Sequence, residues 1–292
     1  MRRRRRLWPR RRLSGAAVVA AVSSLLVLSI GGSLSAAAAA RFDGGAGAPP
    51  GASSANSPRH WIPPAQLTWY WQLQGRLRFE PVAVTDIDGF DSSAATVAAL
   101  HARGEHVICY MDAGTWENWR PDARRFPRTV LGRGVGWPGE RWLDVRRLSV
   151  LEPIMRARFA MCARKGFDAV EADNIDGFEN ATGFPISAGA QLTYDEWIAR
   201  TVHALGLAVL QKNDPEQATR LQPYFDGVLD EQCNQYAECA SFRPYLRAGK
   251  PVLNAEYQRS LYPGFCERDR RLGIDGALFA LALDGSLFRP CP

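Results

Sequence analysis

The sequence lacks the residue patterns that build a metal cage. It has no CxxC pair. Zinc sites draw on Cys and His ligands at close spacing, so neither a zinc site nor any other bound metal is expected. The four histidines are scattered along the chain: His60, His101, His106 and His203. Beyond the first forty residues, no apolar run is long enough to span a bilayer. Hydrophobic residues make up 46% and charged residues 23% of the chain, which excludes disordered, collagen-like and coiled-coil proteins.

The basic balance of the chain comes from its first forty residues. The formal net charge is +6, but eight of the 36 Lys and Arg residues lie in this stretch, which holds no lysine, aspartate or glutamate. The rest carries 28 basic against 30 acidic residues and is slightly negative. It therefore has no overall charge that would attract nucleic acid, and no nucleic-acid partner is expected.

The same stretch has the three parts of a secretory signal. A basic segment from Arg2 to Arg12 precedes an apolar run over 13–34 and a run of alanines over 36–40. We therefore expect residues 1–40 to be a signal peptide used by the general or the twin-arginine export route, and cleaved before Arg41. The alternative is an uncleaved membrane anchor. Residues 41–60 are rich in Gly, Ala, Pro and Ser and predict a flexible linker, which leaves residues 61–292 as the folded domain of a secreted protein.

Six cysteines in an exported chain predict disulfide bonds. The local pair within residues 233–239 is the safest assignment, and it would close a small loop beside a candidate catalytic residue. The expected pairs are Cys233 with Cys239, Cys266 with Cys291, and Cys109 with Cys162.

Short apolar runs alternate with amphipathic stretches from residue 67 onward, a pattern typical of a parallel α/β fold. Eight such runs predict a (β/α)₈ TIM-type barrel. Only residues 74–81 separate the first two runs, too few for a regular crossover, so the first β/α unit is expected to be degenerate. The last helix is expected to be missing or replaced. The predicted strands cover 68–73, 82–87, 106–111, 169–173, 208–211, 227–230, 251–255 and 277–283.

Three helices stand out between these runs. One is predicted over 92–103 and ends at Gly104, and a second over 149–165 ends at Gly166. A third is predicted from the capping-box spacing of Thr193 and Glu196, and Gly206 closes it.

Carboxylates recur where the apolar runs end. In a TIM barrel the active site lies at these carboxyl ends of the strands. A ring of carboxylates without His or Cys fits glycoside hydrolysis, and it also fits Mg²⁺ or Ca²⁺ binding. Seven of the nine tryptophans fall between residues 61 and 142, which favours a sugar ligand, since flat apolar rings stack on sugar faces. Trp71 is a candidate for such stacking, with burial in the core as the alternative.

Several short motifs, taken in order, resemble glycoside hydrolase family 114. They are Trp69-Tyr-Trp-Gln-Leu73, Asp86-Ile-Asp88 with Phe90-Asp91, Tyr110 through Ala113-Gly114 to Glu117, Arg120-Pro-Asp122, Asp168-Ala-Val-Glu-Ala-Asp173-Asn-Ile-Asp176-Gly, and Asp230-Glu-Gln-Cys233 through Tyr236 to Glu238-Cys239. The resemblance runs from about Trp69 to Tyr257. It implies a (β/α)₈ barrel with endo-α-1,4-polygalactosaminidase activity, which needs no cofactor.

The resemblance also implies a catalytic pair. Asp173 corresponds to the nucleophile and Glu231 to the acid/base, and both close predicted strands. Asp230 is a rival for the second role, because a shift of one residue in strand register would exchange the faces of the two side chains. The resemblance favours retention of configuration, although the sequence alone leaves inversion open.

Further polar and aromatic residues are expected to bind substrate around this pair. Glu171 lies one layer deeper on the strand of Asp173 and is expected to pair with Lys212, with a like-charge effect on its neighbours as the alternative. Arg120 is expected to pair with a nearby acid. The long loop after the third strand is expected to form a wall of the cleft. The candidate substrate-binding residues are Trp71, Asp86, Tyr110, Asp112, Glu117, Glu171, Asn174, Asp176, Lys212, Asn213, Glu256 and Tyr257.

The expected partner is a cationic, galactosamine-rich polysaccharide, which a cleft lined by carboxylates would attract. We expect a monomer that meets a membrane only if the signal segment is kept. Two other classes remain open at this point. One is a glycan-binding barrel without turnover, and the other is a metal-dependent hydrolase that uses the acidic cluster.

Overall fold

Eight parallel strands form the barrel that the apolar runs predict. The computed structural model describes residues 60–292, so the predicted signal peptide and nearly all of the predicted linker lie outside the described residues. Each of the eight barrel strands is parallel to its neighbours among the eight. In their order across the sheet, which is also their order along the chain, the strands are β1 (Trp69–Gln72), β2 (Val84–Asp88), β3 (His106–Asp112), β7 (Ala169–Asp173), β8 (Ala208–Lys212), β9 (Gly227–Glu231), β10 (Val252–Glu256) and β11 (Asp275–Phe279).

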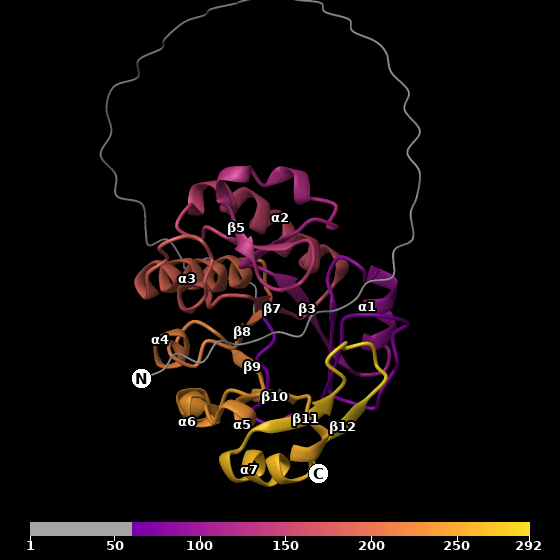
Figure 1. Ribbon diagram of the computed structural model, residues 1–292. Coiled ribbons are helices and arrows are strands. Elements are labelled where there is room, and N and C mark those ends of the chain that lie inside the picture. The colour runs from indigo at the N-terminus through magenta and orange to yellow at the C-terminus, as the bar shows by residue number, and fades with distance from the viewer. Residues whose placement is uncertain (1–59) are drawn as a thin grey trace, which may run out of the picture. The chain divides into compact units, whose positions relative to one another are not determined.

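The helices cover the outside of this sheet (Figure 1). Because both faces of the strands are covered, β2, β7, β8, β9 and β10 are buried at every position, as parallel strands usually are. One apolar core fills the barrel and includes Leu210 and Leu253, while a larger one lies between strands and helices and includes Phe159 and Val202. The helices are α1 (Ala94–His101), α2 (Leu148–Lys165), α3 (Ala188–Ala204), α4 (Ala218–Leu221), α5 (Cys233–Tyr236), α6 (Arg243–Arg247) and α7 (Gly264–Leu272).

Local sequence signals set the start of α1 and the end of α2. The Ser93 hydroxyl caps α1 by accepting from the amide of Thr96, and α2 ends at Gly166 in the left-handed conformation. The capping box predicted at Thr193 is wrong. Helix α3 begins earlier, at a cap formed by Ser187, and Thr193 lies inside it with its hydroxyl donating to the carbonyl of Gly189.

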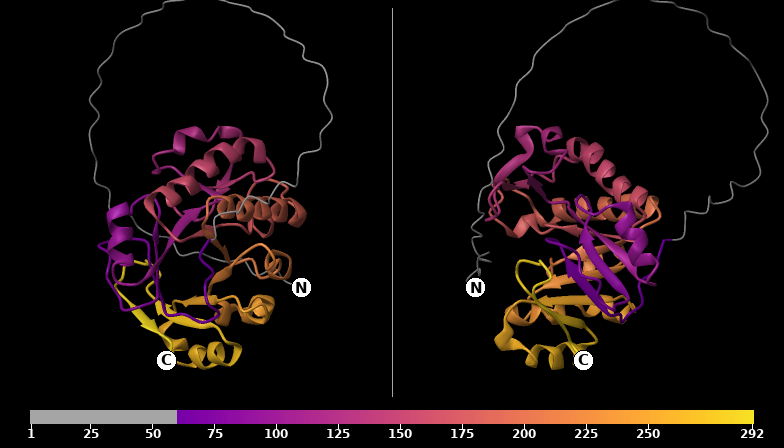
Figure 2. Two further views of the ribbon diagram at one scale, coloured as in Figure 1. Left: turned by 180° about the vertical axis from the view of Figure 1, so that it is seen from behind. Right: turned by 90° about the vertical axis from the view of Figure 1, so that its right-hand side faces the viewer.

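The first and last units of the barrel are irregular, as predicted. Within the described residues no helix lies between β1 and β2, and the last strand, β12 (Phe288–Pro290), pairs antiparallel with β11 in place of a helix. The two ends of the sheet meet through Trp69 Nε1, which donates to the carbonyl of Asp275 at 2.9 Å, and through the amide of Leu73, which donates to Leu283. Two further views show the indigo start and the yellow end of the domain side by side (Figure 2).

The long loop after β3 carries a small second sheet. Strands β4 (Thr115–Glu117), β6 (Glu140–Leu143) and β5 (Leu131–Gly134) pair antiparallel in that order. The sequence predicts this segment as a wall of the cleft but not its strands. Single turns of 3₁₀ helix occupy Ala123–Arg125, Arg128–Val130, Gly177–Glu179, Cys239–Phe242 and Arg259–Leu261.

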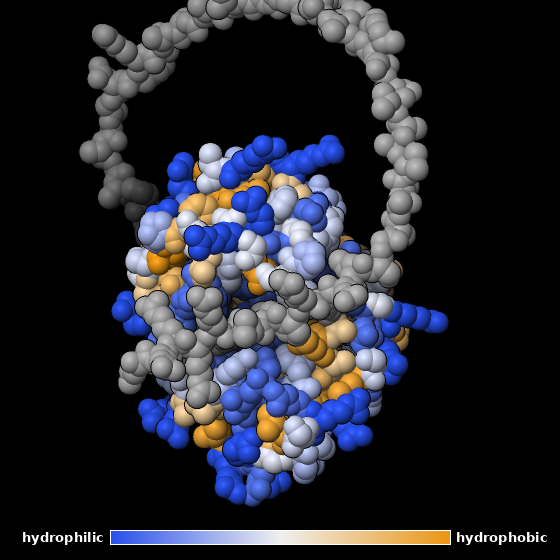
Figure 3. Space-filling view, viewed as in Figure 1, coloured by the Kyte–Doolittle hydropathy of each residue, from blue (hydrophilic) through white to orange (hydrophobic). Residues whose placement is uncertain are grey.

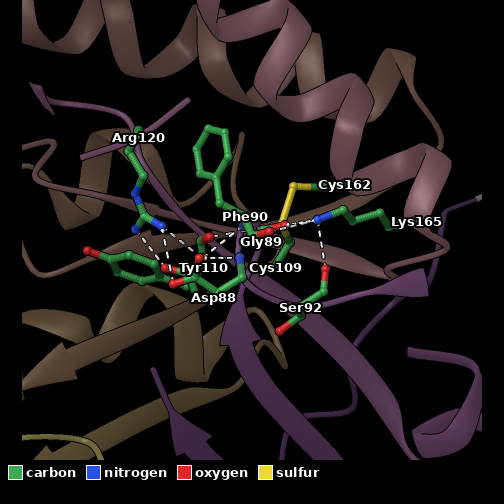
Figure 4. The surroundings of a disulfide bond; sticks show 10 residues. Asp88, Gly89, Phe90, Ser92, Cys109, Tyr110, Arg120, Cys162 and Lys165 are labelled. Carbon is green, nitrogen blue, oxygen red and sulfur yellow. Dashed lines mark hydrogen bonds and ion pairs between the residues drawn. A yellow bond between two sulfur atoms is a disulfide. The ribbon is translucent and has the colours of Figure 1, made fainter. Parts of the chain in front are cut away.

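The three predicted disulfides are present: Cys109 with Cys162, Cys233 with Cys239, and Cys266 with Cys291. The first joins β3 to α2 (Figure 4). Gly89 makes this junction possible, because a Cβ atom there would lie 2.3 Å from the sulfur of Cys109. Lys165 lies beside the junction and donates to the carbonyls of Gly89 and Ser92.

All four histidines lie at the amino-terminal ends of the strands. His203 and His60 stack on one another and share Asp226, and His203 Nε2 lies 2.8 Å from its carboxylate. His101 and His106 share Asp168 in the same way. The Trp61 ring stacks on His106, so the start of the domain rests on both clusters.

The face in Figure 3 is mainly hydrophilic, with separate small hydrophobic patches. Among residues 60–292, none of the helices combines the length and the apolar character that a membrane crossing requires.

Candidate active site

The centre of the site is the ammonium group of Lys212, the last residue of β8. Its Nζ lies 3.0 Å from Asp173 Oδ1 and 2.9 Å from Glu231 Oε2, at the ends of the two neighbouring strands. These two oxygens therefore lie no more than about 6 Å apart, near the spacing of carboxyl groups in retaining glycosidases. The expected pairing of Lys212 with Glu171 is present at 3.5 Å, but Lys212 is closer to the other two carboxylates.

Asp173 is held by neutral donors on its other oxygen. The Tyr110 hydroxyl donates to Asp173 Oδ2 at 2.7 Å, and Asn174 Nδ2 donates to the same oxygen at 3.2 Å. Burial, followed by the charge of Asp173, raises the pKa of Tyr110 well above its ordinary value, so its hydroxyl stays a donor. Tyr110 lies within β3, on the strand beside that of Asp173.

Glu231 is held in a matching way. The Tyr257 hydroxyl makes a short hydrogen bond to Glu231 Oε1, and burial raises the pKa of Tyr257 well above its ordinary value. Asn213 accepts a hydrogen bond from the backbone amide of Glu231 at 2.9 Å through its side-chain oxygen. Asn213 thus fixes the end of β9. Asp230, the rival for the acid/base role, is fully buried one residue earlier.

Each of the three strands that carry this centre is followed by a residue in the left-handed backbone conformation. The residues after Asp173, Lys212 and Glu231 all have positive φ: Asn174 at 61°, Asn213 at 49° and Gln232 at 67°. A left-handed residue turns the chain sharply, and asparagine tolerates this conformation better than most side chains. Each functional side chain therefore stands on the final residue of its strand.

A buried layer lies beneath Lys212 and corrects three expectations. Trp71 is 1% exposed and cannot stack on a sugar; its ring centroid lies 5.0 Å from Lys212 Nζ. Asp86 and Glu171 are fully buried as well and present no surface to a substrate. Burial raises the pKa of Asp86 to about 7, and burial together with the charge of Asp86 raises the pKa of Glu171 well above its ordinary value.

Two arginines bind acidic side chains of the loop after β3 and of the end of β2. Arg120 binds Asp88 through both terminal nitrogens, at 3.0 and 2.6 Å, and binds Glu117 through Nε at 2.6 Å. The expected pairing of Arg120 with an acid is thus confirmed, and Glu117 is occupied by it. Arg158 binds Asp122 through two hydrogen bonds and the carbonyl of Asp112 through a third. Bidentate pairs of this kind fix the geometry of both partners.

The remaining candidates lie apart from the ammonium centre. Glu256 is fully buried and accepts from the amide of Asn234 at 2.9 Å, so the expected role in a sugar subsite is wrong for this side chain. Burial raises its pKa to about 7. Asp176 is half-buried just before the 3₁₀ turn at Gly177–Glu179.

Sequence reasoning missed how the parts connect. It named Lys212 and Tyr257 but gave no sign that one joins the two carboxylates and the other binds Glu231. It named Asp88, the main partner of Arg120, within a motif but left it out of the candidate site residues, and it passed over Glu140, which contacts Thr115. For Asp88 there was a signal, its place at the end of β2, whereas Glu140 belongs to a sheet that no pattern predicted.

A (β/α)₈ barrel with a close carboxylate pair at the carboxyl ends of its strands has the architecture of a glycoside hydrolase. The model of glycoside hydrolase family 114 matches residues 50–290, and the chain belongs to that family. An uncharacterized protein of Deinococcus radiodurans is 28% identical over 260 residues, which span 77% of this chain and 82% of that protein.

Solved structures agree with this fold. The crystal structure of Ega3 from Aspergillus fumigatus in complex with galactosamine is 28% identical, with a TM-score of 0.76, and the match covers 80% of this chain and 98% of that one. The glycoside hydrolase domain of PelA from Pseudomonas aeruginosa has the same fold at 15% identity, with a TM-score of 0.60 over 75% of this chain and 96% of that one.

Proposed function

We propose that this protein is a secreted hydrolase that cleaves α-1,4-linked galactosamine in an exopolysaccharide. The observation that carries the proposal is the Lys212 ammonium group between the carboxylates of Asp173 and Glu231. The structural similarity to Ega3, which was crystallised with galactosamine, supports the choice of sugar. Three disulfides fit an oxidising compartment and support secretion.

In the first step Asp173 attacks the anomeric carbon while Glu231 gives its proton to the leaving glycosidic oxygen. The bond from that carbon to the leaving oxygen breaks as the bond to Asp173 forms. In the second step Glu231 takes a proton from water, the water oxygen attacks the same carbon, and Asp173 leaves as a carboxylate. The close spacing of the two carboxyl groups supports this double displacement and net retention.

The neighbours of the pair serve both steps. Lys212 and Tyr110 stabilise the negative charge of Asp173 before attack and after its departure, at 3.0 and 2.7 Å. Tyr257 and Lys212 stabilise Glu231 when it is ionised, which is the form that accepts the proton from water. The acidic side chains around the cleft would attract a polymer that carries an ammonium group on each deacetylated sugar.

Product analysis by mass spectrometry tests the proposal. The full chain, with Asp173→Asn and Glu231→Gln variants, is incubated with partly deacetylated α-1,4-galactosamine polymer, with and without a chelator. Short oligosaccharides from the wild type alone, unchanged by the chelator, are expected. NMR of the fresh products should show the anomeric configuration of the substrate.

Two other outcomes would overturn this assignment. Loss of activity with the chelator would point to a metal-dependent hydrolase. Polymer binding without any products from the folded wild type would point to a glycan-binding barrel.

A further inference from the structure

The loop after β3 holds the proposed nucleophile at its backbone and at its side chain. The amides of Ala113 and Gly114 both donate to the carbonyl of Asp173 at 3.0 Å. The side-chain amide of Asn174 donates to Asp112 Oδ2 and to Asp173 Oδ2, at 3.2 Å each. The carboxylate of Asp112 therefore sets where Asn174 can place its amide, and through it the carboxylate of Asp173.

Behind Asp112 a single hydroxyl group lies between two carboxyl groups. Thr115 Oγ1 makes a short contact with Asp112 Oδ2 and lies 2.7 Å from Glu140 Oε1. A hydroxyl carries one proton, so it can donate to one of these oxygens and must accept from the other. One of the two carboxyl groups is therefore protonated.

The donors around Asp112 show which group keeps the proton. Asp112 already accepts from the amide of Thr115 at 2.8 Å and from Asn174, as a carboxylate does. Glu140 lies on β6 opposite Glu117 of β4, and both are buried. Burial, followed by the charge of Asp112, raises the pKa of Glu140 to about 10, so Glu140 carries the proton at neutral pH.

We propose that Glu140 is a positioning residue for the Asp173 carboxylate, and that it acts as a neutral donor through Thr115, Asp112 and Asn174. Glu140 donates a hydrogen bond to the Thr115 hydroxyl, and this hydroxyl donates a hydrogen bond to Asp112. Asp112 in turn orients the Asn174 amide that binds Asp173. The small sheet of the cleft wall is thereby coupled to the barrel centre. This inference rests on the proposed function of Asp173.

Variants of Glu140 in the full chain separate positioning from mere packing. Gln keeps a neutral donor at this place, so Glu140→Gln should retain at least half of the wild-type kcat. Glu140→Ala should lower kcat about tenfold and leave KM within about twofold, because the substrate contacts are unchanged. Glu152→Ala, on the surface of α2, is the matched control and should leave both constants unchanged.

The alkaline limb of the pH profile gives a second readout, which does not depend on the folding of the alanine variant. Above about pH 10 the wild type loses the proton of Glu140, so its kcat should fall there more steeply than that of Glu140→Gln. A wild-type kcat for a folded Glu140→Ala variant would overturn the inference, as would identical alkaline limbs for wild type and Glu140→Gln. If Asp173→Asn is itself active, the proposed function fails first. If Asp173→Asn is inactive while the folded Glu140→Ala variant keeps the wild-type kcat, the proposed function stands and only the positioning role of Glu140 fails.

Discussion

At the scale of single residues, the Lys212 ammonium group is the shared partner of the two proposed catalytic carboxylates. It is enclosed by carboxyl groups and the Trp71 ring. Burial lowers the pKa of Lys212, but the charges of Asp173 and Glu231 outweigh this effect, and the net pKa lies well above the ordinary value. The lysine therefore stays charged wherever the enzyme works. Removing either the buried cation or its carboxylate partners leaves a buried charge without a counter-charge, which destabilises the fold.

Replacing Lys212 by Met is expected to lower kcat by at least about tenfold, the lower end of what a charged hydrogen bond contributes. Lys250→Met is the matched control, since Lys250 binds the carbonyls of Gln222 and Phe225 away from these acids. An unchanged kcat in a folded Lys212→Met variant, measured by steady-state kinetics, would contradict the role assigned to this group.

Tyr257→Phe removes only the hydroxyl that donates to Glu231. We expect kcat to fall about tenfold with little change in KM, since the ring still fills its place and the lost bond concerns a charged acceptor. Steady-state kinetics on a galactosamine oligosaccharide would measure this. Tyr262→Phe serves as the control, because Tyr262 packs against Phe265 in a separate apolar cluster.

At the scale of elements, the pattern of apolar and polar residues was enough to predict the main strands and helices of the barrel. All eight barrel strands, the degenerate first unit and the end of α2 at Gly166 followed from apolar runs and punctuating glycines. The small sheet of β4, β6 and β5 was missed because its strands are three or four residues long and only partly buried. The bonds of Lys212 and Tyr257 could not be predicted either, since they depend on which strands become neighbours.

The contact between the loop after β3 and the turn after β7 depends on Gly114. A Cβ atom there would lie 1.6 Å from the carbonyl oxygen of Asn174, so Gly114→Ala must displace one of the two segments. We expect a loss of stability of about 1–3 kcal/mol together with a lower kcat. Gly189→Ala, which meets nothing within 4 Å near the start of α3, should instead stabilise by up to about 1 kcal/mol. Denaturant unfolding of both variants measures whether the free energy of unfolding falls for Gly114→Ala and rises for Gly189→Ala.

At the scale of the whole domain, the two ends of the barrel carry different chemistry. Carboxylates, tyrosines and Lys212 lie at the carboxyl ends of the strands, and the histidine–aspartate clusters lie at the amino ends. Burial raises the pKa of Asp226, but hydrogen bonds from His203 and from the amide of Val209 outweigh it, so the net pKa lies below the ordinary value of 3.8. Asp226 thereby holds the start of the domain at His60.

The lowered pKa of Asp226 gives a stability that depends on pH. A carboxyl group whose pKa is lower in the folded than in the unfolded protein stabilises the fold at pH values above its unfolded pKa. This stabilisation is lost as the pH falls through the folded pKa. Asp226→Asn should therefore cost about 1–3 kcal/mol at pH 7. The difference from the wild type should shrink as the pH falls below about 4. Urea unfolding at several pH values tests this. A difference that stays constant down to pH 2 would contradict the assignment.

The placement of all four histidines at one end makes them a built-in set of probes. Their ring protons resonate apart from most other proton signals, so a proton NMR spectrum would follow His60, His101, His106 and His203 without isotope labelling of single sites. These signals would report whether the amino-terminal end of the barrel is intact, while catalysis at the carboxyl-terminal end is measured in the same sample. A variant that loses turnover but keeps its four imidazole signals unshifted has lost chemistry rather than structure at this end of the barrel.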